Sequence, residues 1–168
     1  YMIKALYDKV KEKHFRIIAS ILCFLGDLAI CRYIYVKMTS EKTFALIMKA
    51  IKMSARQQPG FEKITIPHNF HQEMYQLLIQ TLVLLFIIVI GFHGINYLLY
   101  ILKRAYWAYA YIRVMVWLAA PGVFLLALES ATEFPGLAAY LFVQTFFYLY
   151  VAFGLNHFPI EREKKPLR

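Results

Sequence analysis

The stretch that decides the fold runs from Tyr75 to Leu102 and reads YQLLIQTLVLLFIIVIGFHGINYLLYIL, without a single Asp, Glu, Lys or Arg. As an α-helix it would extend about 42 Å, which exceeds the hydrocarbon thickness of about 30 Å of a typical bilayer. A segment of this length and composition is typical of a membrane-spanning helix. We therefore expect it to cross the bilayer, with tilt or with an overhanging turn.

The composition of the whole chain points the same way. Of the 168 residues, 61% are apolar and 17% are charged, against about 45 to 50% and about 25% in an ordinary soluble domain. A soluble domain of this length has too little interior for so much apolar surface. The sequence predicts an all-α integral membrane helical bundle of about four transmembrane helices plus a basic amphipathic interfacial helix.

Two further spans follow the first stretch. Residues 134–156 are uncharged and dense in aromatic side chains, and residues 105–128 are apolar except for Arg113. Pro121 lies inside residues 105–128 and predicts a kink there, because proline removes a backbone donor and crowds the preceding turn. We group residues 75–168 as a three-span bundle with a basic C-terminal tail.

Residues 17–36 form a less certain span, because they contain Asp27 near the middle and Arg32 further on. A central Asp costs about 2.5 to 3.5 kcal/mol on insertion, whereas each Ile, Leu or Phe returns about 0.3 to 0.6 kcal/mol. Insertion of this segment alone is near balance, and we expect it to span with the help of the other helices. The alternative is a re-entrant or surface-lying hairpin, with only three helices crossing.

Two segments have the pattern of basic amphipathic structure. One is residues 1–16, and the other is a helix over residues 40–56 within the long connection of residues 37–74. Ser40 is a good N-cap, and apolar side chains follow it at helical spacing. We expect the helix to lie on the membrane and to contact lipid headgroups. The basic side chains of its other face are Lys42, Lys49, Lys52 and Arg56.

A net charge of +9 would suggest a nucleic-acid partner in a soluble protein, because Lys and Arg neutralise phosphates. Here the basic residues lie mostly outside the apolar runs, as in membrane proteins, and we expect no nucleic-acid partner. With four spans, the face that holds both termini carries eleven Lys and Arg against six on the other face. The positive-inside rule then places both termini in the cytoplasm. The basic helix 40–56 disagrees, since such helices bind the anionic cytoplasmic leaflet, and it favours the hairpin alternative.

Asp27 and Arg113 are candidates for an ion or proton path, because an ionisable residue inside a membrane is a functional candidate. At about 1.5 Å per residue their depths from the same face are about 15 Å and about 12 Å, so the sequence allows a contact between them. The alternative is a pair that only fixes helix packing. His93 lies within Gly91-Phe-His-Gly94, and we expect a hydrogen-bonded histidine at a close helix approach.

A metal site is a second candidate, because imidazole and carboxylate ligands suit a divalent transition metal. His68, His71, Glu129 and Glu133 would share one face of the four-span arrangement. The alternative interpretation is solvated loop side chains at a helix start. Cys23 and Cys31 are eight residues apart, which fits neither a disulfide nor a metal-ligand spacing. No bound cofactor is expected.

Three functions are compatible with these features. The first is an oligomeric channel or transporter subunit with an intramembrane acidic site at Asp27. The second is a non-catalytic structural or accessory subunit of a larger membrane complex, and the third is a metal-dependent membrane enzyme acting on lipid. The common catalytic motifs are absent from the sequence, which favours a non-enzyme. The expected partners are membrane lipids and a second copy or another membrane subunit.

Overall fold

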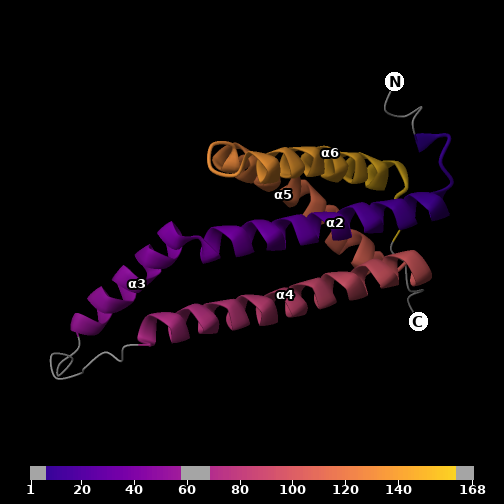
Figure 1. The fold of residues 1–168 in the computed structure, drawn as a ribbon. Helices are drawn as coiled ribbons and strands as arrows, with labels where there is room; N and C mark the ends of the chain where they lie inside the picture. The colour runs from indigo at the N-terminus through magenta and orange to yellow at the C-terminus, as the bar shows by residue number, and fades with distance from the viewer. Residues whose placement is uncertain (1–6, 58–68, 162–168) are drawn as a thin grey trace, which may run out of the picture. The chain divides into compact units, whose positions relative to one another are not determined.

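A computed structural model describes residues 7–57 and 69–161, and in these ranges the chain is helical and has no β-strand (Figure 1). Four helices are long and apolar enough to cross a membrane, and the fifth, α3, is short and amphipathic. The predicted all-α class is confirmed, and the four candidate spans are those of a multi-pass membrane protein. The helices are α2 (Glu12–Thr39), α3 (Glu41–Arg56), α4 (Phe70–Lys103), α5 (Tyr106–Ser130) and α6 (Pro135–His157).

Helix α2 bears on the re-entrant form of the hairpin alternative. It is unbroken from Glu12 to Thr39 and is longer than the predicted segment of residues 17–36. A re-entrant hairpin requires a turn inside this segment, and the helix has none. Its length and hydropathy also place it among the four candidate spans, despite Asp27.

Helices α5 and α6 pack against each other and are joined by a short turn. Helix α5 continues through Pro121 and ends at Ser130. Helix α6 begins with Pro135, where proline is favoured because the first backbone N–H of a helix has no intrahelical acceptor. Small or β-branched side chains fill the buried face of α5, among them Ala108, Val116 and Ala120.

The chain divides into two compact units, which we call unit 1 (residues 1–30 and 89–168) and unit 2 (residues 31–88). In unit 1, Arg104 Nη2 lies 2.9 Å from Glu12 Oε1, which brings the end of α4 to the start of α2. The Tyr109 hydroxyl donates to the Leu155 carbonyl at 3.0 Å, which brings the start of α5 to the end of α6. These four helix ends therefore lie together, as a four-span topology requires.

The segment before α2 packs on the end of α6. Tyr7 is 2% exposed, its hydroxyl donates to the Tyr150 carbonyl at 2.5 Å, and its ring stacks on His157. Gly154 makes room for this contact, because a Cβ at that position would overlap the rings of Phe15 and Tyr7. Burial, together with the neighbouring Tyr150, raises the pKa of Tyr7 to about 12.

Unit 2 contains the predicted amphipathic helix. The Ser40 side chain caps α3 by accepting from the Thr43 backbone N–H at 3.4 Å. Phe44 and Met48 are buried, and the Phe44 ring makes edge contacts with the rings of His71 and Tyr75. The predicted amphipathic helix is confirmed, with an apolar buried face and a basic exposed face. The exposed basic side chains are those of Lys42, Lys49, Lys52 and Arg56.

Candidate functional site

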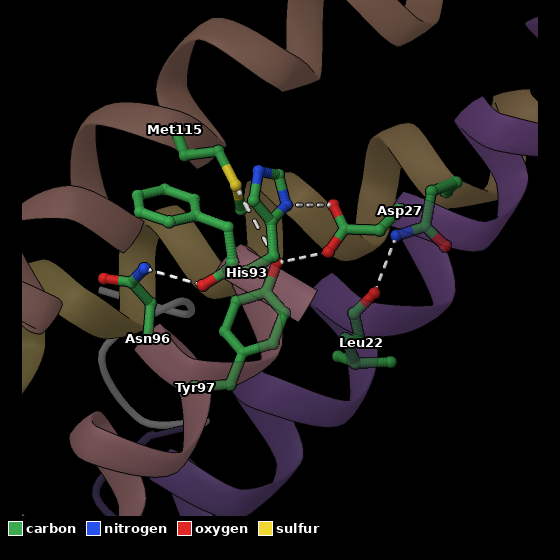
Figure 2. Close-up of polar contacts among 8 residues, drawn as sticks. Leu22, Asp27, His93, Asn96, Tyr97 and Met115 are labelled. Carbon is green, nitrogen blue, oxygen red and sulfur yellow. Dashed lines mark hydrogen bonds and ion pairs between the residues drawn. The ribbon is translucent and has the colours of Figure 1, made fainter. Parts of the chain in front are cut away.

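The centre of unit 1 holds a buried carboxylate with two titratable partners (Figure 2). Asp27 on α2 is 4% exposed. The Tyr97 hydroxyl donates to Asp27 Oδ2 at 2.7 Å, and His93 Nδ1 lies 2.9 Å from Asp27 Oδ1. His93 and Tyr97 are four residues apart on α4, so both side chains project from the same face of that helix. We call Asp27, His93 and Tyr97 the acidic site.

Helices α5 and α6 complete the surroundings of the acidic site. From α5, Met115 places its sulfur 3.8 Å from the Tyr97 hydroxyl, and the ring of Tyr111 meets the His93 ring at 5.8 Å between centroids. From α6, Gln144 Nε2 donates to the Leu22 carbonyl of α2 at 2.9 Å. All four candidate spans therefore contribute to the site.

Close packing of α2 against α6 fixes the position of Asp27. A Cβ built on Gly26 would overlap the hydroxyl and ring of Tyr148 and the amide of Gln144. By contrast, a Cβ at Gly91 or Gly94 would meet no atom within 4 Å. The predicted close helix approach at the glycines that flank His93 is therefore wrong. The close helix approach is instead found at Gly26 of α2, where side chains of α6 fill the space that a Cβ would occupy.

Both oxygens of the Asp27 carboxylate face polar side chains of α4. A buried carboxylate is costly unless it is both paired and hydrogen-bonded. The Tyr97 phenol donates a hydrogen bond to one Asp27 oxygen, and the His93 imidazole lies within ion-pair distance of the other. The Asp27 side chain is 3% exposed, whereas that of His93 is 18% exposed. His93 is thus the more accessible member of the pair.

A polar stripe connects the acidic site to the end of the unit where the helix ends meet. On α2 it follows Glu12, Arg16, Ser20 and Asp27, which fall on one helix face. Arg104 from α4 pairs with Glu12, and Arg16 Nη1 lies 3.8 Å from the same oxygen of Glu12. At about 1.5 Å per residue, the stripe covers about 22 Å along α2.

Several buried polar atoms along this stripe have no protein hydrogen-bond partner within the described residues. They include Ser20 Oγ, Asn96 Oδ1 and the Tyr100 hydroxyl. Arg16 is 9% exposed, and its Nε also has no protein hydrogen-bond partner within the described residues. An unsatisfied buried polar group costs about 1 to 3 kcal/mol. The interior of unit 1 is accordingly more polar than helix packing alone requires.

Arg113 does not join the acidic site. Within the described part of the chain, the ion pairs and hydrogen bonds of Asp27 are with His93 and Tyr97, and the sequence-based pairing with Arg113 is not formed. The reason is helix rotation: Ile112 is fully buried on α5, and the next residue points about 100° away. Arg113 is exposed and lines a shallow groove with Tyr109 and Trp117.

The candidate metal ligands are distributed over both units of the chain. His71 belongs to unit 2 and meets the Phe44 ring. Glu129 and Glu133 belong to unit 1, at the end of α5 and in the turn that follows. His68 lies outside the described residues. No group of three or more His, Cys, Asp or Glu side chains is placed to bind a metal in residues 7–57 and 69–161, so this ligand set stays a prediction.

The sequence contains a pattern that indicates the partners of Asp27, but this pattern is not a pair of opposite charges. His93 and Tyr97 lie four residues apart in a stretch of α4 that otherwise lacks ionisable side chains, apart from Tyr100. Two such groups on one helix face in a span indicate a polar neighbour across the interface. Comparisons of the chain with models of protein families, with curated proteins and with solved structures find no match.

Proposed function

We propose that this chain is a subunit of an oligomeric membrane transporter or channel in which the acidic site takes up and releases a proton. The observation that carries the proposal is the buried Asp27 carboxylate, held by His93 on one oxygen and by Tyr97 on the other. Ionisable residues inside membrane spans are rare and mark ion pathways and proton relays.

The chemistry of the pair suits proton exchange. Histidine is the side chain that changes charge between pH 5 and 8. With a proton on Nδ1, a neutral His93 donates to the Asp27 carboxylate, and the site carries one negative charge. A second proton on Nε2 makes an ion pair with no net charge. Binding one proton therefore changes the charge of the site without breaking the contact with Asp27.

The polar stripe supplies a route for the proton in this proposal. It leads from Glu12 and Arg104 at the meeting helix ends to Asp27. The buried polar atoms of Ser20 and Asn96 that have no protein partner among the described residues are able to bind water along it. Water bridging these atoms would connect His93 with the end of the unit.

Assembly is part of the proposal. Helix α4 exposes large apolar side chains, with Leu84, Ile87 and Ile88 each at least 60% exposed. These side chains face lipid or another subunit, and four helices alone rarely enclose a pathway. A second copy or a partner membrane subunit would complete the pore. The excess of Lys and Arg on the face of the termini supports a cytoplasmic location for both termini, whereas the basic helix α3, which then lies on the other face, argues against it.

Proton flux into liposomes tests the function. The purified chain is reconstituted with a pH-sensitive dye inside, and a potassium gradient with valinomycin drives the flux. Asp27→Asn keeps an acceptor for Tyr97 but removes the charge, and His93→Gln removes the titrating ring. Both variants are expected to reduce flux at least tenfold. His14→Gln, at an exposed position before the apolar part of α2, is the matched control.

A structural or accessory role is the alternative, and the contacts of both Asp27 oxygens with side chains of α4 favour it. In that role the acidic site fixes the packing of α2 on α4. Folded Asp27→Asn and His93→Gln proteins with wild-type flux, or a wild-type protein without flux above empty liposomes, would support this alternative against the transport proposal.

A further inference from the structure

Unit 2 has a shallow, open surface pocket with a basic lining. Its volume is about 460 Å³, within the range of about 300 to 1,000 Å³ that small-molecule sites occupy. Among the described residues its lining has no acidic side chain, and these lining residues all belong to unit 2. We call it the basic pocket. Its lining residues are Ala45, Met48, Lys49, Lys52, Met53, Arg56 and His71.

The sequence of α3 brings the basic side chains together. Lys49, Lys52 and Arg56 are spaced by three and four residues, which places them along one helix face. His71 reaches the pocket from the first turn of α4, and the edge contact with the Phe44 ring positions it there. Phe44 is itself buried, so this arrangement is part of the packing of the unit.

The lining fits a ligand with two chemical parts. Two ammonium groups and a guanidinium attract a phosphate, and the guanidinium can donate two parallel hydrogen bonds to its oxygens. The remaining lining, Ala45, Met48 and Met53, is apolar and is suited to hydrocarbon. Free inorganic phosphate would leave this apolar part of the pocket unused. A phospholipid has both parts in one molecule.

The position of the pocket in the chain agrees with a lipid. Helix α3 starts directly after Ser40, where the candidate span α2 has just ended. His71 lies at the start of the candidate span α4. Both connections place the pocket beside the ends of candidate membrane spans, where the headgroups of a bilayer would lie. We propose that the basic pocket binds the phosphate headgroup of an anionic phospholipid.

This inference refines the expected lipid contact of α3. The four basic side chains proposed from the sequence form a general surface, but Lys42 does not line the pocket and His71 does. The ligand would therefore occupy a defined site at the C-terminal half of α3. The proposal is independent of proton transport, because no residue of the acidic site takes part.

Binding of short-chain lipids to the purified full chain in zwitterionic micelles tests the proposal, with isothermal titration calorimetry as the readout. Dioctanoyl phosphatidic acid is the probe, and dioctanoyl phosphatidylcholine and inorganic phosphate are the comparison ligands. We expect phosphatidic acid to bind at least tenfold more tightly than either comparison ligand. Equal affinity for inorganic phosphate would show a free-anion site and overturn the proposal.

Charge variants separate a site from diffuse attraction. Each Lys or Arg near an anionic surface contributes about fivefold in affinity, so the triple variant K49Q/K52Q/R56Q is expected to bind about 100-fold more weakly. The control K9Q/K11Q/K13Q removes the same charge from exposed positions in the N-terminal segment. An equal loss in both triple variants would contradict a defined pocket.

A steric pair tests the cavity without changing charge. Ala45 and Ala50 are both exposed on the same helix, but only Ala45 is among the lining residues of the pocket. Ala45→Trp fills part of the cavity and is expected to weaken phosphatidic acid binding at least tenfold, while Ala50→Trp binds as wild type. Wild-type binding by Ala45→Trp would overturn the proposal even if the charge variants behave as expected.

Discussion

Unit 1 buries Asp27 and Arg16 among its helices, whereas the basic side chains of α3 in unit 2 are exposed. In unit 1, Asp27 is 4% exposed and Arg16 is 9% exposed, and both lie among packed helices. In unit 2, the basic side chains of α3 stand on the exposed face of an amphipathic helix. Buried charge is costly and has to be paired, whereas exposed charge remains solvated and available to ligands. The comparison separates the proposed site for proton exchange from the proposed site for lipid.

Removal of one buried charge is the most severe test of this difference. In Asp27→Ala, His93 and Tyr97 both lose their partner, and breaking a buried pair in this way costs about 3 to 5 kcal/mol. The free energy of unfolding, from SDS titration in mixed micelles, measures it. The exposed triple variant K49Q/K52Q/R56Q is expected to change stability by less than about 0.5 kcal/mol per substitution. Similar losses in the two variants would remove the distinction between the units.

Overpacking at Gly26 tests how tightly unit 1 is built around the acidic site. An added methyl group would overlap Tyr148 and Gln144, so Gly26→Ala is expected to destabilise the protein by about 1 to 3 kcal/mol. In Gly94→Ala the same change meets open space and is expected to stabilise α4 by up to about 1 kcal/mol, since alanine favours the helix. The same titration compares them. If Gly26→Ala is as stable as Gly94→Ala, the close approach of α2 and α6 is wrong.

The buried Tyr7 gives a smaller effect at the edge of unit 1. Tyr7→Phe loses the hydrogen bond to the Tyr150 carbonyl and is expected to lower stability by about 1 kcal/mol at neutral pH. The pKa of Tyr7 is raised to about 12 in the folded protein, so above about pH 10 the unfolded chain ionises first. Wild-type stability should then fall between these pH values more steeply than that of Tyr7→Phe. Parallel Tm curves against pH would contradict the burial of Tyr7.

The smallest effect is expected at the N-cap of α3 in unit 2. The Ser40 side chain accepts from Thr43 N–H at 3.4 Å, a long contact, so Ser40→Ala is expected to cost about 0.5 kcal/mol, the low end for N-caps. Ser54→Ala, at an exposed position of the same helix, is the control. Circular dichroism during thermal unfolding measures both variants. A Tm loss in Ser54→Ala as large as that in Ser40→Ala would argue against a specific cap.

The elements were predictable from the sequence because length and charge determine them. The uncharged stretch from Tyr75 to Leu102 fits within α4, and the pattern after Ser40 predicts α3 and its buried face. The partners of Asp27 were not predictable in the same way. Apolar side chains surround a membrane span on every side, so the sequence does not define which face packs inward. The rotation of α5 turned Arg113 outward, and that of α4 turned His93 and Tyr97 toward Asp27.

The protonation of His93 in a lipid bilayer tests the proposed acidic site most directly. Solid-state ¹⁵N spectra of histidine-labelled protein identify its resonance as the one that disappears in His93→Gln. Proton exchange at the acidic site predicts that this resonance converts from imidazole to imidazolium as the pH falls from 8 to 5, and that the conversion changes in Asp27→Asn. A resonance that stays in one form throughout this range would contradict the proposal that His93 and Asp27 take up and release a proton.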